Sequence, residues 1–178
     1  MKQLILGGAR SGKSNFAQDL ALQEHLPLEQ RLPVTVIATA EAGDKEMAER
    51  IARHQEDRPK GWTTVEAAIT LGSALQQADK QKGLILVDCL TLWITNLLLA
   101  EKGTLEKEVA NLLEILDSIN SDIIFVSNET GQGIIPMDPL SRRFVDEAGR
   151  LHQQIAKATD RTIYVVAGLP QVLKGPSL

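Results

Sequence analysis

The sequence predicts an α/β protein with a mostly parallel sheet. Short apolar runs typical of buried strands alternate with longer segments of helical spacing, as in successive strand–helix–strand units. The run GLILVD at 83–88 is apolar up to its last residue, as expected for a strand that is covered on both faces. The 178 residues suffice for one domain with a sizeable core, so we expect a single domain over 1–178.

The expected elements follow in order along the chain. The strand QLILG, 3–7, leads into a helix over 12–24, where Phe16 and Leu20 share one face. Further strands are predicted where aliphatic and β-branched residues cluster, at 34–39, 62–67, 83–88, 122–128 and 162–168. Helices are predicted where apolar residues recur every three to four positions, at 44–58, 69–81, 91–101, 104–119 and 138–159. The segment 169–178 contains two prolines and a glycine, and we expect it to be irregular.

Composition and charge narrow the function classes. Hydrophobic residues make up 43% and charged residues 24%, which is ordinary for a soluble globular protein. The net charge of −4 and the absence of a basic run favour no nucleic-acid partner. The single cysteine, Cys89, excludes an internal disulfide and a zinc site of cysteine pairs. The longest apolar stretch, 90–100, is too short for a membrane span, and the chain opens on a strand pattern instead of a signal peptide, so we expect a cytoplasmic protein.

A phosphate-binding loop is the strongest functional signal. Gly7-x4-Gly12-Lys13-Ser14 satisfies G-x-x-x-x-G-K-[ST] between a predicted strand and a predicted helix. Glycines let the backbone turn tightly and direct its N–H groups at phosphate oxygens, and the helix start adds its positive dipole end. In this motif the lysine reaches the β- and γ-phosphates, and the serine hydroxyl reaches Mg2+. The predicted nucleotide-binding residues here are Gly7, Gly8, Ala9, Arg10, Ser11, Gly12, Lys13 and Ser14.

Asp88 is the predicted partner of this loop. It ends the apolar run 84–88, as the acid of a Walker-B strand does, and it would hold Mg2+ together with Ser14, directly or through water. The same residue could instead cap the helix over 91–101, and both roles could hold together. These two features predict a nucleotide-binding domain, but they do not separate an ATPase, a kinase and a nucleotidyltransferase.

His54 is a candidate nucleophile. It lies in RIARHQEDRP, and on a helix it is the i+4 neighbour of Arg50. An arginine-rich face suits phosphate-rich ligands, and nearby positive charge favours the neutral, nucleophilic imidazole. By spacing alone, an ordinary exposed histidine is the competing interpretation.

Five segments carry a resemblance that covers nearly the whole chain. They occur in the order GGARSGKS (7–14), RIARHQEDRPKGWTTVE (50–66), VDCLTLWITNLL (87–98), VSNETGQGIIP (126–136) and RRFVDEAGRLHQQIA (142–156). Together they resemble the bifunctional adenosylcobinamide kinase / adenosylcobinamide-phosphate guanylyltransferase family of cobalamin biosynthesis. The runs H-x-x-x-R-P-x-x-W and N-E-x-G-x-G-I-x-P are far more specific than the phosphate loop. The resemblance implies a three-layer P-loop NTPase domain with a mostly parallel RecA-like sheet, in a homotrimer.

The resemblance also implies two reactions on a corrinoid substrate. ATP or GTP phosphorylates the aminopropanol hydroxyl of adenosylcobinamide. His54 then attacks the α-phosphate of GTP, pyrophosphate leaves, and the guanylylated histidine passes GMP to adenosylcobinamide phosphate. Lys13, Mg2+ and arginines would offset the charge on the departing pyrophosphate.

Further nucleotide contacts are implied by position. They are Ala38, Thr39 and Ala40 at a strand end, Gln55, Glu56, Asp57 and Arg58 after the histidine, and the acidic residues Glu66 and Asp88. An acid suits guanine, whose N1–H and 2-amino groups are adjacent donors. Which of these two acids meets the base and which meets the metal stays open. Without the resemblance, Glu66 could equally be a solvated charge at a strand end.

The later motifs leave alternatives open. The loop SNETGQGIIP, 127–136, places Asn128 and Glu129 at a strand's carboxyl end, where the resemblance implies a corrinoid or phosphate site and the glycines alone suggest a turn. His152 stands where the family commonly has asparagine, and the sequence does not display a base for the acceptor hydroxyl. The competing functions are a simple P-loop metabolite kinase without a covalent histidine and a RecA-like ATPase that acts on a protein or nucleic acid.

Overall fold

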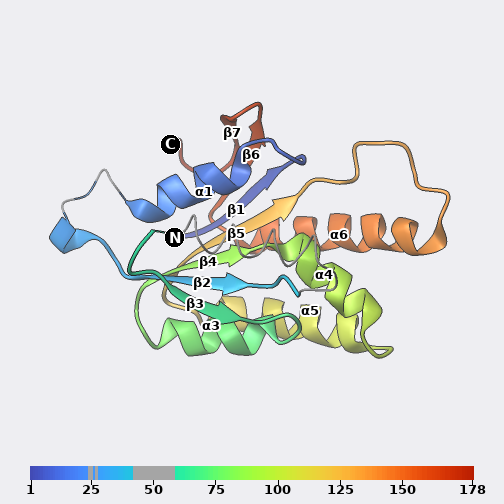
Figure 1. Ribbon diagram of the computed structural model, residues 1–178, viewed down its shortest axis with the longest axis horizontal. Coiled ribbons are helices and arrows are strands. Elements are labelled where there is room, and N and C mark those ends of the chain that lie inside the picture. Colours follow the sequence, from blue (N-terminus) through green and yellow to red (C-terminus); the bar gives the residue numbers. More distant parts are fainter. Residues whose placement is uncertain (24–25, 27, 42–58) are drawn as a thin grey trace.

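The computed structural model describes residues 1–23, 26, 28–41 and 59–178, and seven strands of this part form one sheet. The strand order is β3-β2-β4-β5-β1-β6-β7 (Figure 1). The strands are β1 (Lys2–Gly7), β2 (Val34–Ala38), β3 (Thr63–Glu66), β4 (Leu84–Asp88), β5 (Asp122–Asn128), β6 (Arg161–Val166) and β7 (Leu169–Lys174). All neighbouring pairs are parallel except β6 and β7. The predicted mostly parallel sheet is therefore confirmed.

Helices cover both faces of the sheet and make three layers (Figure 1). On one face lies α1 (Lys13–Leu22). On the other lie α3 (Leu71–Asp79), α4 (Leu90–Leu99), α5 (Thr104–Leu116) and α6 (Pro139–Ala158). A short 3-10 helix, η1 (Leu28–Gln30), precedes β2. The bounds of these helices agree with the predicted ones within three residues, and the helix predicted over 44–58 lies outside the described residues.

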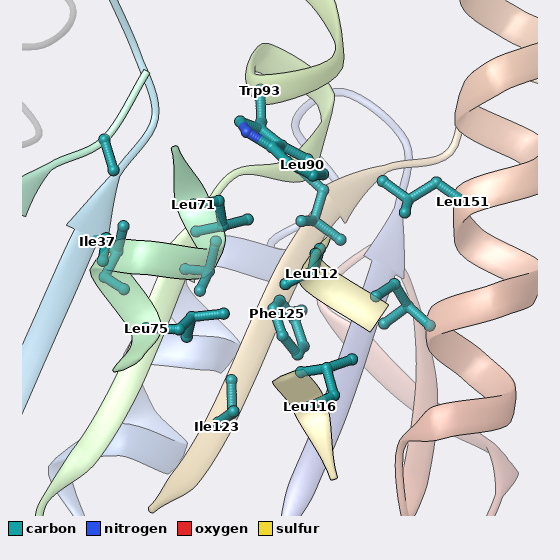
Figure 2. Packing of buried hydrophobic residues seen from close by; sticks show 14 of the residues in the cluster. Ile37, Leu71, Leu75, Leu90, Trp93, Leu112, Leu116, Ile123, Phe125 and Leu151 are labelled. Atoms are coloured by element: carbon teal, nitrogen blue, oxygen red, sulfur yellow. The ribbon is translucent and has the colours of Figure 1, made fainter. Parts of the chain in front are cut away.

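Two apolar clusters explain the continuous strand runs. The larger cluster joins α3–α6 to the sheet, and Figure 2 shows Leu71, Trp93, Leu112 and Phe125 packed within it. Trp93 and Phe125 are fully buried. The smaller cluster packs α1 against the opposite face. Because β1, β4 and β5 are covered on both faces, most of their successive side chains are apolar, and the alternation of apolar and polar residues typical of a half-exposed strand is absent.

The expectation that 169–178 is irregular is wrong, because residues 169–174 form β7, antiparallel to β6. Ala167 and Gly168 connect the two strands with φ of 51° and 79°. Positive φ at both central residues is the property of the tight type I′ hairpin turn. Pro170 is tolerated because β7 is an edge strand, where a missing N–H need not break a ladder.

None of the helices in the described part of the chain combines the length and the apolar character that crossing a bilayer requires.

Candidate nucleotide site

The phosphate loop, residues 7–14, is wound tightly between β1 and α1. Ser11 N–H donates to the Gly8 carbonyl at 3.2 Å, and Gly12 adopts φ 91°. A Cβ on Gly7 would lie 2.4 Å from Ser11 Oγ and 2.7 Å from the Val165 carbonyl oxygen. Both distances are shorter than real Cβ contacts, so the loop and the neighbouring strand close together only around a glycine.

Polar groups in this loop are arranged as an anion site. The N-cap residue of α1, Gly12, makes no side-chain cap, so no side chain of that residue covers the first-turn N–H groups. Lys13 is only 8% exposed, and its Nζ donates to the Gly8 carbonyl at 3.3 Å. Ser11 Oγ is buried without a hydrogen-bond partner among the described residues. Uncapped N–H groups, a buried cation and an unpartnered hydroxyl together suit a phosphate.

The β6–β7 hairpin supports this loop from the side. Gly168 N–H donates to the Ser11 carbonyl at 2.8 Å, and a Cβ on Gly12 would lie 3.0 Å from Gly168 Cα. Sequence reasoning missed this contact because it treated the hairpin as irregular. The available signal was Gly168 between two β-prone runs, since glycine readily adopts the positive φ that a tight hairpin turn requires.

The carboxyl ends of the strands bring several predicted residues to one edge of the sheet. Asp88 pairs with Ala38, and Ala38 pairs with Glu66. Gly7 pairs with Asn128 of β5, the strand that separates β1 from β4. With strands ~4.8 Å apart, Asp88 lies about 10 Å and Glu66 about 19 Å across the sheet from β1. Asp88 is half-buried and Glu66 is exposed.

Asp88 does not cap α4. The N-cap residue of that helix is Cys89, and α4 has no side-chain cap. The alternative interpretation of Asp88 as a helix cap is therefore wrong, because α4 begins at Leu90 and the N-cap position directly before it is Cys89. Burial and the neighbouring Asp88 carboxylate raise the pKa of the Cys89 thiol, which keeps the thiol protonated at neutral pH.

The side chain of Thr39 holds the sheet edge together. Its hydroxyl donates to the Cys89 carbonyl at 2.7 Å and accepts from the Cys89 N–H at 2.9 Å. Asn96 Nδ2 donates to the Thr39 carbonyl at 2.8 Å and to the Ala68 carbonyl at 3.1 Å. Thr39 is fully buried, so its hydroxyl is engaged inside the protein, while Ala40 follows it half-buried at the edge.

A chain of polar contacts lies behind the end of β5. Asn128 N–H donates to Thr91 Oγ1 at 2.8 Å, and the Thr91 and Ser127 hydroxyls are 3.3 Å apart. Ser127 Oγ is 2.7 Å from His152 Nε2. Burial lowers the pKa of His152, with Glu129 opposing it, so the ring is neutral at neutral pH. His152 therefore has a buried hydrogen-bonding role that its sequence position did not reveal.

Glu129 joins this chain of contacts to the phosphate loop. Its N–H donates to the Gly7 carbonyl at 3.0 Å, and its Oε1 accepts from Gly131 N–H at 2.6 Å. Its Oε2 lies 3.8 Å from His152 Nδ1. The loop after β5 thus forms a structured turn, whose backbone is attached to Gly7 and whose Glu129 carboxylate contacts Gly131 and His152.

The remaining predicted site residues, His54, Gln55, Glu56, Asp57 and Arg58, lie outside the described residues.

Comparison with known proteins identifies the family. Residues 3–173 match a family model described as cobinamide kinase / cobinamide phosphate guanyltransferase, CobU. The bifunctional adenosylcobalamin biosynthesis protein CobP of Pseudomonas aeruginosa is 51% identical over 179 residues, 100% of both chains. The corresponding CobU proteins are 35% identical in Salmonella typhimurium and 33% in Escherichia coli, over 98% of this chain and 100% of theirs.

Solved structures confirm the fold. A KaiC-like protein from Pyrococcus horikoshii, 15% identical, has a TM-score of 0.52 over 92% of this chain and 69% of that chain. A second Pyrococcus horikoshii protein, PH0250, 10% identical, has a TM-score of 0.58 over 99% of this chain and 87% of that chain. The predicted α/β architecture is thus shared, and the full-length relatives are described as bifunctional cobalamin biosynthesis proteins, which fits neither a simple metabolite kinase nor a RecA-like ATPase. The chain belongs to the cobinamide kinase / cobinamide phosphate guanylyltransferase family and is a bifunctional, nucleotide-using enzyme of cobalamin biosynthesis.

Proposed function

We propose that this enzyme holds the triphosphate of ATP or GTP on residues 7–14 and transfers GMP through a covalent intermediate on His54. The observation that carries the proposal is the uncapped start of α1 beside the unpartnered Ser11 hydroxyl and the buried Lys13. These groups supply N–H, O–H and ammonium donors to one place, and a triphosphate is the ligand that needs all three.

Oxygen donors at the same edge fit Mg2+. Ser14 lies in the first turn of α1 and Asp88 ends β4, and a hydroxyl with a carboxylate are ligands that Mg2+ accepts. Mg2+ supplies charge neutralisation of the phosphates when bound. Ser14 and Asp88 would hold it in both reactions, and Lys13 would neutralise charge on the β- and γ-phosphates.

The distances of Asp88 and Glu66 from β1 support different roles for these two acids. Asp88 lies about 10 Å from β1 and Glu66 about 19 Å, two and four strand spacings. The nearer acid suits a metal at the phosphates, and the farther acid suits the guanine at the other end of the nucleotide. We therefore assign Asp88 to Mg2+ and Glu66 to guanine N1–H and the 2-amino group. Ala38, Thr39 and Ala40 lie at the end of β2, between the strands that carry these two acids, and in this proposal the nucleoside passes along this edge.

His54 is the proposed nucleophile of guanylyl transfer. The chain has three histidines, and His152 is unsuited because it is buried and bonded to Ser127. An imidazole nitrogen of His54 forms a bond to the α-phosphorus of GTP as the bond to the pyrophosphate oxygen breaks, and pyrophosphate leaves. The phosphate oxygen of phosphorylated cobinamide then displaces the imidazole and takes the GMP. Gln55, Glu56, Asp57 and Arg58 accompany the guanylyl group.

The test is capture of the covalent intermediate. The enzyme is incubated with α-labelled GTP and Mg2+, and the adduct is located by mass spectrometry after proteolysis at neutral or alkaline pH. We expect one GMP on His54, its loss in His54→Ala, and its retention in His25→Ala. A His54→Ala enzyme that still forms the adduct, or that turns over at the wild-type rate, would refute the proposal.

We also infer that copies of the chain assemble into a homotrimer. Residues 134–137, which precede α6, form an apolar arm of sequence IIPM. Two of its side chains are almost fully exposed, Ile134 at 97% and Met137 at 94%. Beside the arm is a groove of about 340 Å³ whose apolar lining includes Leu98, Leu99, Leu140 and Phe144. Contiguous exposed apolar surface of this kind favours a protein partner.

Light scattering coupled to size exclusion tests the assembly. We expect a mass three times the 19.4 kDa of one chain, reduced in Met137→Asp because a charge would be buried at the interface. Lys102→Asp, at an exposed turn, is the control. A wild-type mass of 19.4 kDa in micromolar solution would refute the trimer.

A further inference from the structure

We propose that Glu129 is the general base of the phosphorylation step and that His152 and the Gly131 N–H position its carboxylate. The proposal rests on the placement of the nucleotide phosphates at residues 7–14 argued above. It assigns a role to the acid that directly follows β5 and to the buried polar contacts behind it, neither of which the nucleotide contacts use.

The position of Glu129 follows from the strand order. Strand β5 lies between β1, which leads into the phosphate loop, and β4, which ends in Asp88. Glu129 directly follows β5, and its N–H donates to the carbonyl of Gly7 at 3.0 Å. Its backbone is therefore attached to the first residue of the phosphate loop, on the side of that loop that faces Asp88.

Other described acids at this edge are less suited to the task. Asp88 is assigned to Mg2+, and Glu66 lies four strand spacings from β1. Glu41, after β2, is exposed and three strand spacings from β1. The Glu129 side chain is only 20% exposed, so it is largely shielded from bulk water while part of its surface stays accessible. A carboxylate in this setting can take a proton from the hydroxyl of a bound acceptor instead of contacting mainly bulk water.

The two ring nitrogens of His152 have different neighbours. Nε2 lies 2.7 Å from Ser127 Oγ, and the Ser127 hydroxyl is 3.3 Å from that of Thr91, which accepts from Asn128 N–H. Nδ1 lies 3.8 Å from Glu129 Oε2. We assign the proton of the neutral ring to Nδ1, because that tautomer places a positive dipole end beside the carboxylate and leaves Nε2 to accept from Ser127.

The carboxylate is thus oriented while part of it stays free. Gly131 N–H donates to Oε1 at 2.6 Å, and His152 Nδ1 lies 3.8 Å from Oε2, too far for a hydrogen bond but close enough to attract the carboxylate electrostatically. A carboxylate offers about four lone-pair sites, and the Gly131 N–H engages one of them. The remaining sites can accept the proton of a substrate hydroxyl, and the Gly131 N–H together with the His152 ring restrains the side chain for it.

In the proposed phosphorylation step, the acceptor hydroxyl oxygen forms a bond to the γ-phosphorus. The bond from that phosphorus to the β–γ bridging oxygen breaks. The nucleoside diphosphate leaves with the bridging oxygen and its electron pair. The hydroxyl proton passes to the Glu129 carboxylate and then to solvent. General-base catalysis of this kind contributes roughly 10²–10⁴-fold to a rate.

The test compares the two activities of the full-length enzyme in Glu129→Gln. Glutamine keeps the size of the side chain and an oxygen for the Gly131 N–H, but it takes no proton at neutral pH. We expect kcat for phosphorylation of cobinamide by ATP to fall at least ~100-fold with KM nearly unchanged. The rate of guanylyl-enzyme formation from GTP falls far less, because that step attacks the α-phosphate with a different nucleophile. Glu114→Gln, on the exposed face of α5, is the control in both assays.

Two outcomes would overturn the proposal. One is a Glu129→Gln enzyme whose phosphorylation kcat stays within about threefold of wild type, far below the effect of a lost general base. The other is an equal loss of both activities, which would indicate a structural role. If Lys13→Ala instead binds ATP with wild-type affinity, the placement of the phosphates is wrong, and that result is separate from the behaviour of Glu129→Gln.

A pair of substitutions tests His152 as a positioning residue. In His152→Asn, the amide N–H reaches the place of Nδ1 and faces Glu129, but contact with Ser127 is lost. In His152→Gln, the longer amide reaches Ser127 and leaves nothing at the Nδ1 place. We expect His152→Asn to retain most of the phosphorylation kcat. We expect His152→Gln to have a phosphorylation kcat about tenfold lower, with KM unchanged in both variants. Equal effects, or a larger loss in Asn, would remove His152 from this role.

Discussion

Replacing Gly12 with alanine tests how the phosphate loop is held. Gly12 has φ 91°, a left-handed conformation that costs an L-residue ~1–2 kcal/mol. The new Cβ would also lie 3.0 Å from Gly168 Cα, a backbone atom, and overpacking of this kind costs ~1–3 kcal/mol. We therefore expect Gly12→Ala to lower the free energy of unfolding by about 2–5 kcal/mol. For a chain of 178 residues this lowers Tm by roughly 4–20 °C.

The assay is urea and thermal unfolding followed by circular dichroism, without nucleotide. Gly8→Ala is the matched control in the same loop, because its φ is not left-handed and its Cβ would meet nothing within 4 Å. We expect it to change the free energy of unfolding by less than ~0.5 kcal/mol. If Gly12→Ala is as stable as wild type, or if both alanines destabilise equally, the contact between the hairpin and the loop does not constrain residue 12.

Three further predictions concern the neighbourhood of the site. Because burial lowers the pKa of His152, the unfolded chain binds its proton first, so stability falls as pH drops below about 6.5 and levels off below the folded pKa. His152→Asn should flatten this fall in urea titrations between pH 7 and 5, and an unchanged slope would contradict it. Ser11→Ala should leave the stability of the nucleotide-free enzyme unchanged, because Ser11 Oγ has no partner there, while calorimetry shows ~5–10-fold weaker ATP binding. Asn96→Ala removes donors to the Thr39 and Ala68 carbonyls and should cost ~1–3 kcal/mol in urea unfolding, whereas a neutral effect would mean that water replaces the amide.

The parts of the fold that could be predicted are those that depend on local pattern. The apolar run of β4 and the glycines around Lys13 each carry their reason within a few residues, since burial on both faces and a tight turn are local requirements. The hairpin of β6 and β7 was missed because Pro170 and the glycines suggested irregular structure. An edge strand accepts that proline, but a position at an edge is known only once the sheet is assembled.

The site was predictable to a similar extent. The phosphate loop and Asp88 follow from motifs, whereas the contacts of His152 do not, because they join α6 to residues 25 positions earlier on β5. The role of Asp88 as a helix cap was wrong because a helix start shifted by one residue changes which side chain can cap it. The roles of the phosphate loop, Asp88, His54 and Glu66 in binding and catalysis remain predictions.

The interior position of β1 in the sheet has a consequence for synthesis of the enzyme. Gly7 pairs with Asn128 and with Val165, which follow it by 121 and 158 positions. At 5–20 residues per second, a ribosome needs roughly 8–30 s after making the loop before its second neighbour exists. A nascent chain carries the complete G-x-x-x-x-G-K-S motif through this interval without the strands that shape it. ATP in the cell can therefore stabilise only a chain that is nearly finished, and it cannot template the early folding of its own binding loop.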